Sequence, residues 1–198
     1  AHIGLAIMLI GILFSSGYSS IQSNNYTGLV WNSDFPDDVN NNNMLLFLNE
    51  DRKVGKFDVN YLGQRKKIKA NSGYINSNYL EFIPLSNNHI LKKEISVGGK
   101  FYKENDTVEV DNNDITYFEL LFEDESSSFS LFPKVQVDPN SDMIVFSPDV
   151  QNNILEDFYV HVRTYPDPDQ ETIWSERDSV SVALKETFFL NDFVSSVD

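Results

Sequence analysis

The stretch I-T-Y-F-E-L-L-F-E-D-E-S-S-S-F-S-L-F, residues 115–132, decides the expected fold. Residues 115–122 are rich in β-branched and aromatic side chains, which are favoured in strands. The polar run from Glu123 to Ser126 has turn composition, and residues 128–132 return to a strand-type sequence that Pro133 stops. We therefore predict two strands joined by an acidic, solvated hairpin tip.

Similar short runs occur on both sides of this hairpin and are separated by turn residues. Gly98-Gly99 lies between two of them and is a hairpin signal, because glycine reaches the positive φ values of tight turns. Short strands at close spacing indicate antiparallel sheets, so the expected fold class is mainly β, an antiparallel β-sandwich or barrel. The remaining runs lie at residues 45–47, 57–61, 79–83, 94–97, 100–102, 107–110, 143–146, 158–163, 180–184 and 188–193. Residues 32–43 are expected to form a loop, and a short helix at residues 148–155 or 174–178 is an alternative to strand.

An apolar run from Ile3 to Phe14 begins the chain. Crossing hydrocarbon takes ~20 helical residues, and continuing the run to Tyr18 makes it nearly long enough. No basic residue precedes the run and no Ala-x-Ala site follows it, which weakens a signal-peptide interpretation. We predict a piece of a longer protein that begins inside a transmembrane helix; a core helix or a residual signal sequence is the alternative. The expected division is a transmembrane helix segment at residues 1–20, a polar linker at 21–43 and an extracytoplasmic β domain at 44–198.

Composition narrows the function classes. Fifteen Lys and Arg residues against 30 Asp and Glu residues give a formal net charge of -15, which excludes a nucleic-acid partner because phosphate binding needs a concentrated basic surface. The absence of cysteine excludes disulfides, zinc-thiolate sites and thiol nucleophiles. No nucleophile, phosphate-loop or dinucleotide motif is present, so the β domain is expected to be non-catalytic. A secreted hydrolase with an unrecognised acidic site is a weaker alternative.

Two features are candidates for a site. His2 stands at the start of the apolar run, where an ionisable side chain needs a partner, a water-filled cavity or a metal. The basic residues Arg65, Lys66, Lys67 and Lys69 oppose the overall charge and could dock onto anionic lipid or an acidic partner. An edge strand that lysines protect against mispairing explains these basic residues equally well. The other histidines, His89 and His161, are expected to be an exposed turn residue and a strand residue without a ligand role.

The segment A-H-I-G-L-A-I-M-L-I-G-I-L-F-S-S-G-Y-S, residues 1–19, resembles the A-H-x-G-x-x-x-x-x-x-G helix of the cytochrome c biogenesis proteins CcmF, in the haem-handling CcmF/CcsA superfamily. The later stretches Y-F-E-L-L-F-E, F-S-L-F-P-K-V-Q-V, M-I-V-F-S-P-D-V and E-D-F-Y-V-H-V resemble the extracytoplasmic β domain of that family, particularly its Bacteroidetes-like members. The resemblance spans nearly the whole chain.

This resemblance implies a fragment of a membrane haem lyase component that handles haem and presents it to apocytochrome c. His2 matches the histidine proposed as an axial iron ligand of a resident haem b, whose second ligand lies outside this chain. The implied partners are haem, apocytochrome c and other cytochrome c maturation subunits. The implied location is the bacterial cytoplasmic (inner) membrane, with the β domain on the periplasmic side. A membrane-anchored periplasmic β-sandwich that binds a partner without catalysis is the alternative function.

Overall fold

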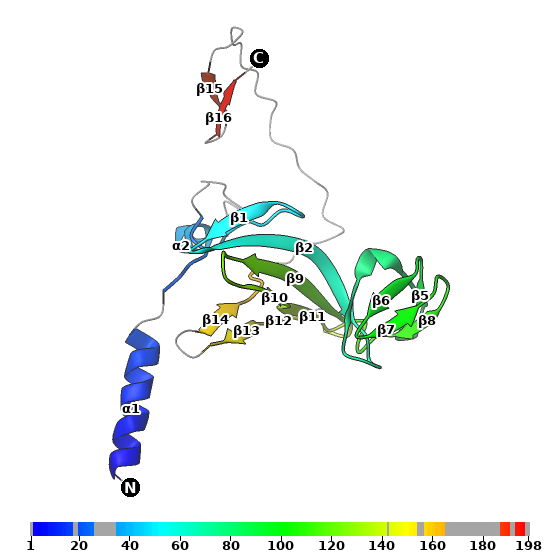
Figure 1. Cartoon of the computed structure of the whole chain (residues 1–198), viewed down its shortest axis with the longest axis horizontal. Coiled ribbons are helices and arrows are strands. Elements are labelled where there is room, and N and C mark those ends of the chain that lie inside the picture. The colour runs from blue at the N-terminus through cyan, green and yellow to red at the C-terminus, as the bar shows by residue number, and fades with distance from the viewer. Residues whose placement is uncertain are drawn as a thin grey trace. The chain divides into compact units, whose positions relative to one another are not determined.

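The structure, a computed structural model, describes residues 2–17, 20–25, 35–141, 143–153, 157–164, 187–190 and 193–196. It is mainly β, and every pairing between its strands is antiparallel (Figure 1), as the sequence predicts. The chain divides into two compact units. One combines Ala1–Leu45 with Glu176–Asp198, and the other is Leu46–Ser175.

The described residues of the first unit form two helices and a two-stranded sheet. They are α1 (His2–Gly17), α2 (Asp37–Asn42), β15 (Thr187–Leu190) and β16 (Phe193–Ser196). α2 lies where we predicted a loop: Asp37 and Asp38 suit the positive end of a helix, and the Asn43 side chain donates to the Val39 carbonyl at 2.6 Å. The predicted strand at residues 188–193 is wrong in extent, because two strands share this region. The predictions for residues 174–178 and 180–184 lie outside the described residues.

A seven-stranded sheet forms most of the second unit. Its order is β1 (Asp51–Val54), β2 (Phe57–Lys67), β9 (Ile115–Glu123), β11 (Lys134–Val137) and β12 (Ile144–Ser147), with β3 (Tyr74–Asn76) beside β2 and β10 (Ser128–Leu131) beside β9. The predicted hairpin of residues 115–132 is confirmed as β9–β10. Among the described strands the sheet is open, with β1 and β12 at its two ends, so the barrel alternative is wrong.

The strand that begins at Ser128 stops before Pro133 as expected, because β10 ends at Leu131 and β11 begins at Lys134. β10 and β11 pair with β9 in one continuous register, from Ser128 opposite Glu123 to Gln136 opposite Ile115. Pro133 has no N–H to donate, yet its carbonyl accepts from the Phe118 N–H at 2.9 Å. The register with β9 is therefore kept across the break at Pro133, from β10 to β11.

One face of the sheet carries an aromatic core. Phe57 packs edge-on against Phe122, Phe129 and Phe158, with ring centroids 5.0–6.0 Å apart. Phe158 belongs to β14 (Asp157–Val160), which pairs with β13 (Asp149–Asn152), so this hairpin packs on the sheet face. The helix alternative at residues 148–155 is wrong, because residues 149–152 form β13.

A small lobe extends from the C-terminal end of β2, away from the aromatic core at Phe57. It contains the 3-10 turn η1 (Ser77–Tyr79) and the strands β4 (Leu80–Phe82), β5 (Asn88–Leu91), β8 (Thr107–Glu109), β6 (Ile95–Val97) and β7 (Lys100–Tyr102). Gly98 and Gly99 have φ values of 57° and 73°, which confirms the predicted β6–β7 hairpin turn. The lobe has its own core, separate from the aromatic core. Its buried members are Ile68, Ile75, Leu80, Leu91, Tyr102, Val108 and Val110.

Candidate functional site

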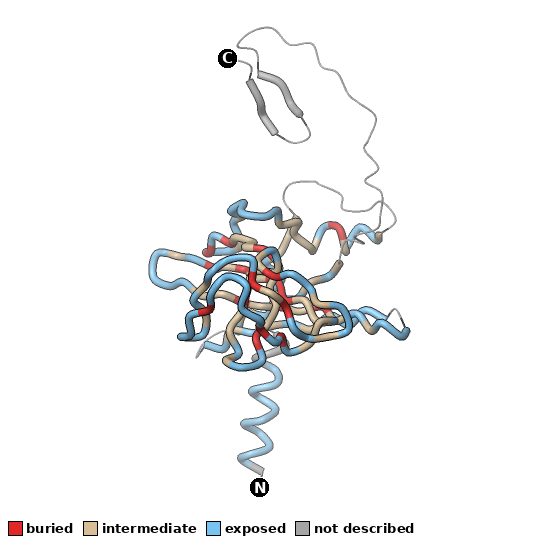
Figure 2. The backbone as a smooth tube through the Cα atoms, turned by 90° about the vertical axis from the view of Figure 1, so that its right-hand side faces the viewer, coloured by how far each residue is buried: buried red, intermediate tan, exposed pale blue. Residues whose placement is uncertain are grey.

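The helix α1 has an apolar surface that is exposed along its length. Every residue from Ile3 to Leu13 is exposed, with 78% of Ile3 and 68% of Leu13 accessible (Figure 2). A Cβ atom at Gly4 or Gly11 would meet nothing within 4 Å, so a neighbouring helix or a flat ring could approach the backbone closely there. No helix in the described part of the chain has the length and apolarity needed to cross a membrane.

His2 is the first residue of α1, and its side chain lies outside what the structure describes. No group of three or more potential metal ligands forms among the described residues. His161 is exposed and lies beside Tyr159, with ring centroids 5.7 Å apart. β14 ends at Val160, however, so His161 follows the strand instead of lying within it.

The prediction that His89 is an exposed turn residue is wrong. His89 lies in β5 between β4 and β8, and only 5% of it is accessible. Its ring packs against Phe82 at 5.6 Å, and Nδ1 lies 3.4 Å from the Asn87 carbonyl oxygen. Burial lowers the pKa of His89, which favours the neutral ring. The residue therefore contributes to the packing of the small lobe.

The basic residues at positions 65–69 do not form one positive surface. Arg65 Nε donates to Glu119 Oε2 at 2.5 Å, and Lys69 Nζ pairs with Glu109 Oε1 at 2.5 Å. Lys66 donates hydrogen bonds to Asn113, in the loop before β9, and to Ile115 and Thr116 at the start of β9. Among the described residues, only Lys67 of these four makes no side-chain hydrogen bond or ion pair. The edge-strand explanation is wrong for Arg65, which lies between β3 and β9. Lys66 and Lys67 pair with β3 alone among the strands, and Lys69 follows the end of β2.

Lys66 anchors the loop that leads into β9. Its Nζ donates to the carbonyl oxygens of Asn113 and Ile115, both at 2.7 Å, and to Thr116 Oγ1 at 3.2 Å. Burial lowers the pKa of Lys66 to about 8, although the nearby Asp114 carboxylate opposes the shift. The sequence contained a signal for this separate role, because consecutive strand residues point to opposite faces and Lys66 therefore cannot share a face with Arg65.

A groove of about 270 Å³ opens between the main sheet and the small lobe. The Arg65–Glu119 ion pair lies in it, and Ser130 Oγ donates to the same carboxylate at 3.4 Å. Two tyrosines complete its polar and aromatic character: Tyr74 stacks on the Phe132 ring at 3.9 Å, and Tyr79 carries the Lys93 ammonium 3.5 Å above its ring. Such a lining can bind a flat or peptide-like ligand. The sequence analysis missed it, because its residues come from β2, β3, β6, β9 and η1.

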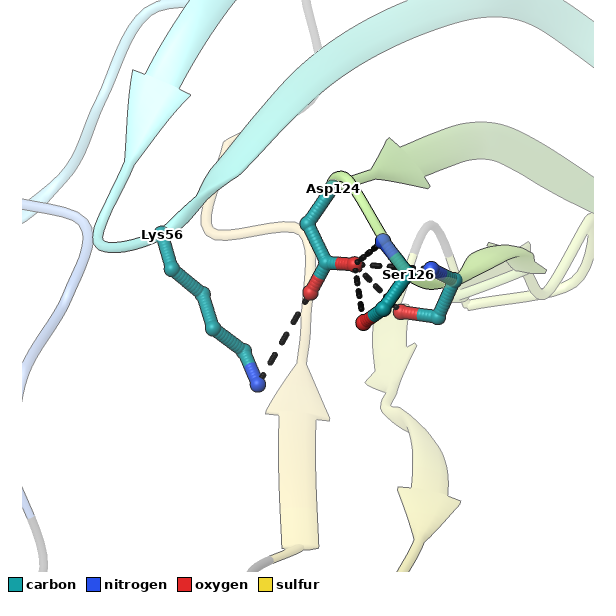
Figure 3. A network of polar contacts seen from close by, with 4 residues as sticks. Lys56, Asp124 and Ser126 are labelled. Carbon is teal, nitrogen blue, oxygen red and sulfur yellow. Dashed lines mark hydrogen bonds and ion pairs between the residues drawn. The ribbon is translucent and has the colours of Figure 1, made fainter.

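The acidic hairpin tip between β9 and β10 is a structural turn (Figure 3). Asp124 Oδ1 accepts from the backbone N–H and hydroxyl groups of Ser126 and Ser127, at 2.7–3.0 Å. Its Oδ2 lies 3.8 Å from Lys56 Nζ. The hydrogen bond from the Ser126 N–H is the main cause that lowers the pKa of Asp124 to about 2. The carboxylate therefore stays ionised and shapes the turn, while the flanking Glu123 and Glu125 are solvated as predicted.

No protein-family model, curated protein or solved structure matches the chain.

Proposed function

We propose that this chain is part of a CcmF-like membrane protein that handles haem during c-type cytochrome maturation. The observation that carries the proposal is α1, an exposed apolar helix with a histidine as its first residue. An apolar helix surface of this kind is stable when lipid or neighbouring apolar helices cover it. The acidic β-sandwich-like unit that follows would then stand on the periplasmic side of the inner membrane.

The length of α1 bears on how it would lie in a membrane. Sixteen helical residues extend about 24 Å, against a hydrocarbon thickness of about 30 Å. We propose that α1 forms the outer part of a membrane helix, with His2 surrounded by other helices of the same protein. An unpartnered histidine is costly in such surroundings, and binding to iron would satisfy it.

The residues of α1 fit a haem-binding role as one half of a site. Neutral imidazole is a good ligand for haem iron, and two histidines from facing helices can hold a haem in a helix bundle. The open space beside Gly4 and Gly11 would admit a flat macrocycle. Haem b bound there would supply a redox-active iron. The second ligand would come from a helix outside this chain.

A second candidate function is a membrane-anchored binding module in which His2 has no ligand role. The groove beside Arg65 and Glu119 favours it, because a polar and aromatic groove is a common feature of binding sites. The two functions are compatible in one protein, since the β unit could bind apocytochrome c or another maturation subunit while α1 holds haem. The two functions make different predictions about His2: only the haem-handling function requires it for haem binding.

The test uses the full-length protein purified in detergent as wild type, as His2→Ala and as Met8→Leu. Haem content per protein and the visible spectrum are measured, with elution volume and circular dichroism as controls for folding. We expect His2→Ala to lose most of its haem. Met8→Leu should match wild type, since it removes the thioether of α1 and leaves the imidazole. Wild-type haem content and spectrum in a folded His2→Ala protein would leave only the binding-module function.

A further inference from the structure

Among the described strands, β12 lies at an edge of the seven-stranded sheet, and its residues are exposed on both faces. Its sequence, with the residue before it, is Met143-Ile144-Val145-Phe146-Ser147, which carries no charge. Met143 is 61% and Val145 49% accessible, and the alternate residues Ile144 and Phe146 are exposed as well. Exposure of consecutive strand residues means that neither face packs on the core. Four large apolar side chains therefore lie in solvent along a sheet edge.

The hydrogen-bonding groups of this edge can be assigned from the pairing of β11. In β11, the Val137 N–H donates across to Asp114 on the β9 side, whereas the Asp138 N–H donates to the Met143 carbonyl. Since these directions alternate along a strand, Met143 and Val145 bond toward β11. The N–H and C=O groups of Ile144 and Phe146 then face the open edge. No described residue bonds to these groups through its backbone, so a further strand could pair with them.

The opposite edge of the same sheet shows the usual protection against such pairing. In β1, three of the four residues are charged: Asp51, Arg52 and Lys53. Arg52 pairs with Glu50 at 3.2 Å and Lys53 with Asp58 at 3.0 Å. Charged side chains on an edge strand oppose the addition of another chain. β12 carries no such charges. An edge strand without this protection can receive a partner strand.

The charge around β12 indicates the chemistry of that partner. Lys134 of β11 lies opposite Ser147 at the end of β12. Residues 135–160 contain no lysine or arginine, and the whole chain carries a net charge of -15. A second copy of the chain would bring two acidic surfaces together, whereas a cationic segment would be attracted. The acidic residues of this stretch are Asp138, Asp142, Asp149, Glu156 and Asp157.

We propose that β12 is the docking edge for an extended, lysine- or arginine-bearing polypeptide segment, which adds to the sheet as a further strand. The outward backbone groups of Ile144 and Phe146 hold its main chain, and the exposed apolar side chains of β12 pack against alternate side chains of the added strand. The carboxylates of the acidic stretch at residues 135–160 select its positive charge. This docking edge is independent of the haem role of α1.

The probe is a fluorescein-labelled peptide, K-V-K-V-K-V-K, with blocked ends. E-V-E-V-E-V-E serves as the charge control, and K-V-K-P-K-V-K serves as the strand-breaking control. Binding to the whole chain in a nonionic detergent is followed by fluorescence anisotropy. We expect the first peptide to bind at least about tenfold more tightly than either control, and its affinity to fall as salt is added. Equal affinity for the lysine and glutamate peptides would overturn the proposal.

Two chain variants locate the binding. Ile144→Lys places a charge on the edge and should weaken binding about tenfold, a difference of about 1.4 kcal/mol. Tyr159→Lys adds the same charge at another exposed apolar position and should change affinity by less than about twofold, since it is off the edge. Circular dichroism checks that both variants fold. Equal effects of the two substitutions would contradict docking at β12.

Amide hydrogen exchange of the wild-type chain gives a readout that does not depend on any variant. The bound peptide should slow exchange at Ile144 and Phe146 more than at Val145, because only the first two amides face the edge. Protection confined to another strand would overturn the assignment. Concentration-dependent self-association, with protection at β12 in the absence of peptide, would identify a second copy as the occupant and refute the cationic partner.

Discussion

Replacing Lys66 by methionine should remove a specific pH dependence of stability. Lys66 Nζ is half-buried and bonds to two carbonyl oxygens and one hydroxyl oxygen at the start of β9. Burial lowers its pKa in the folded chain to about 8, from 10.5 in the unfolded chain. Methionine has a similar length and no ionisable group, so Lys66→Met deletes this titration while it keeps most of the packing.

The sign follows from proton binding. Between pH 8 and 10.5 the unfolded chain keeps the Lys66 proton while the folded chain has released it, so the free energy of unfolding rises with pH in this window. From about pH 7.5 to about pH 9.5 the two pKa values give a gain of about 2 kcal/mol. The pKa values of Tyr74 and Tyr117 are raised by burial, so these groups stay protonated over this range.

The assay is urea unfolding of the whole chain in detergent, followed by circular dichroism at pH steps across this range. The unfolding free energy of wild type minus that of Lys66→Met should grow by about 2 kcal/mol with rising pH. Lys67→Met is the matched control for the loss of one lysine, because the adjacent side chain lies on the other face of β2. A flat difference for Lys66→Met would refute the assigned burial of the ammonium group.

Three further predictions concern the aromatic core at Phe57, the β domain at residues 44–197 and the side chain of Lys67. Phe57→Ala should lower the free energy of unfolding by about 3–5 kcal/mol in urea titrations, because it opens the centre of the aromatic core; a loss below about 1 kcal/mol would contradict that packing. Residues 44–197 alone should fold with a mainly β circular dichroism spectrum and give no saturable haem Soret shift; a helix-dominated spectrum would contradict the domain boundary. Lys67→Glu should weaken cytochrome c maturation in cells at normal protein levels, since this lysine remains for docking; unchanged maturation would refute that role.

Much of the β architecture could be predicted from local sequence. The β9–β10 hairpin combined strand-favouring runs with a polar tip, and Gly98-Gly99 supplied a turn that needs positive φ. Pattern reading failed where strand residues are polar or follow proline. β5 begins with Asn88 and His89, which have the composition of a turn, but the fold buries the imidazole ring of His89. β11 follows Pro133, where the carbonyl of proline keeps the register although its nitrogen donates no bond.

The candidate site was harder to predict, because charge along a sequence does not give the partner of each side chain. Arg65, Lys66 and Lys69 lie close together in the chain, yet each has different partners: Arg65 pairs with Glu119 of β9, Lys66 bonds Asn113 and the first residues of β9, and Lys69 pairs with Glu109 of β8. Strand alternation could have separated Lys66 from its neighbours. The ion pair of Arg65 depends on the register between β2 and β9, which a bulge at Gly63 shifts by one residue. Such a register is a tertiary property.

The most direct test of the proposed haem role is chemical rescue of the full-length protein as His2→Gly. The variant is purified with and without imidazole in the buffer, and its haem content and reduced visible spectrum are compared with those of wild type. Free imidazole can occupy the space of the deleted ring and bind iron in its place. We predict loss of haem without imidazole and recovery of haem and of the wild-type spectrum with it. Wild-type haem content in His2→Gly without imidazole would contradict the assignment of His2 as an iron ligand.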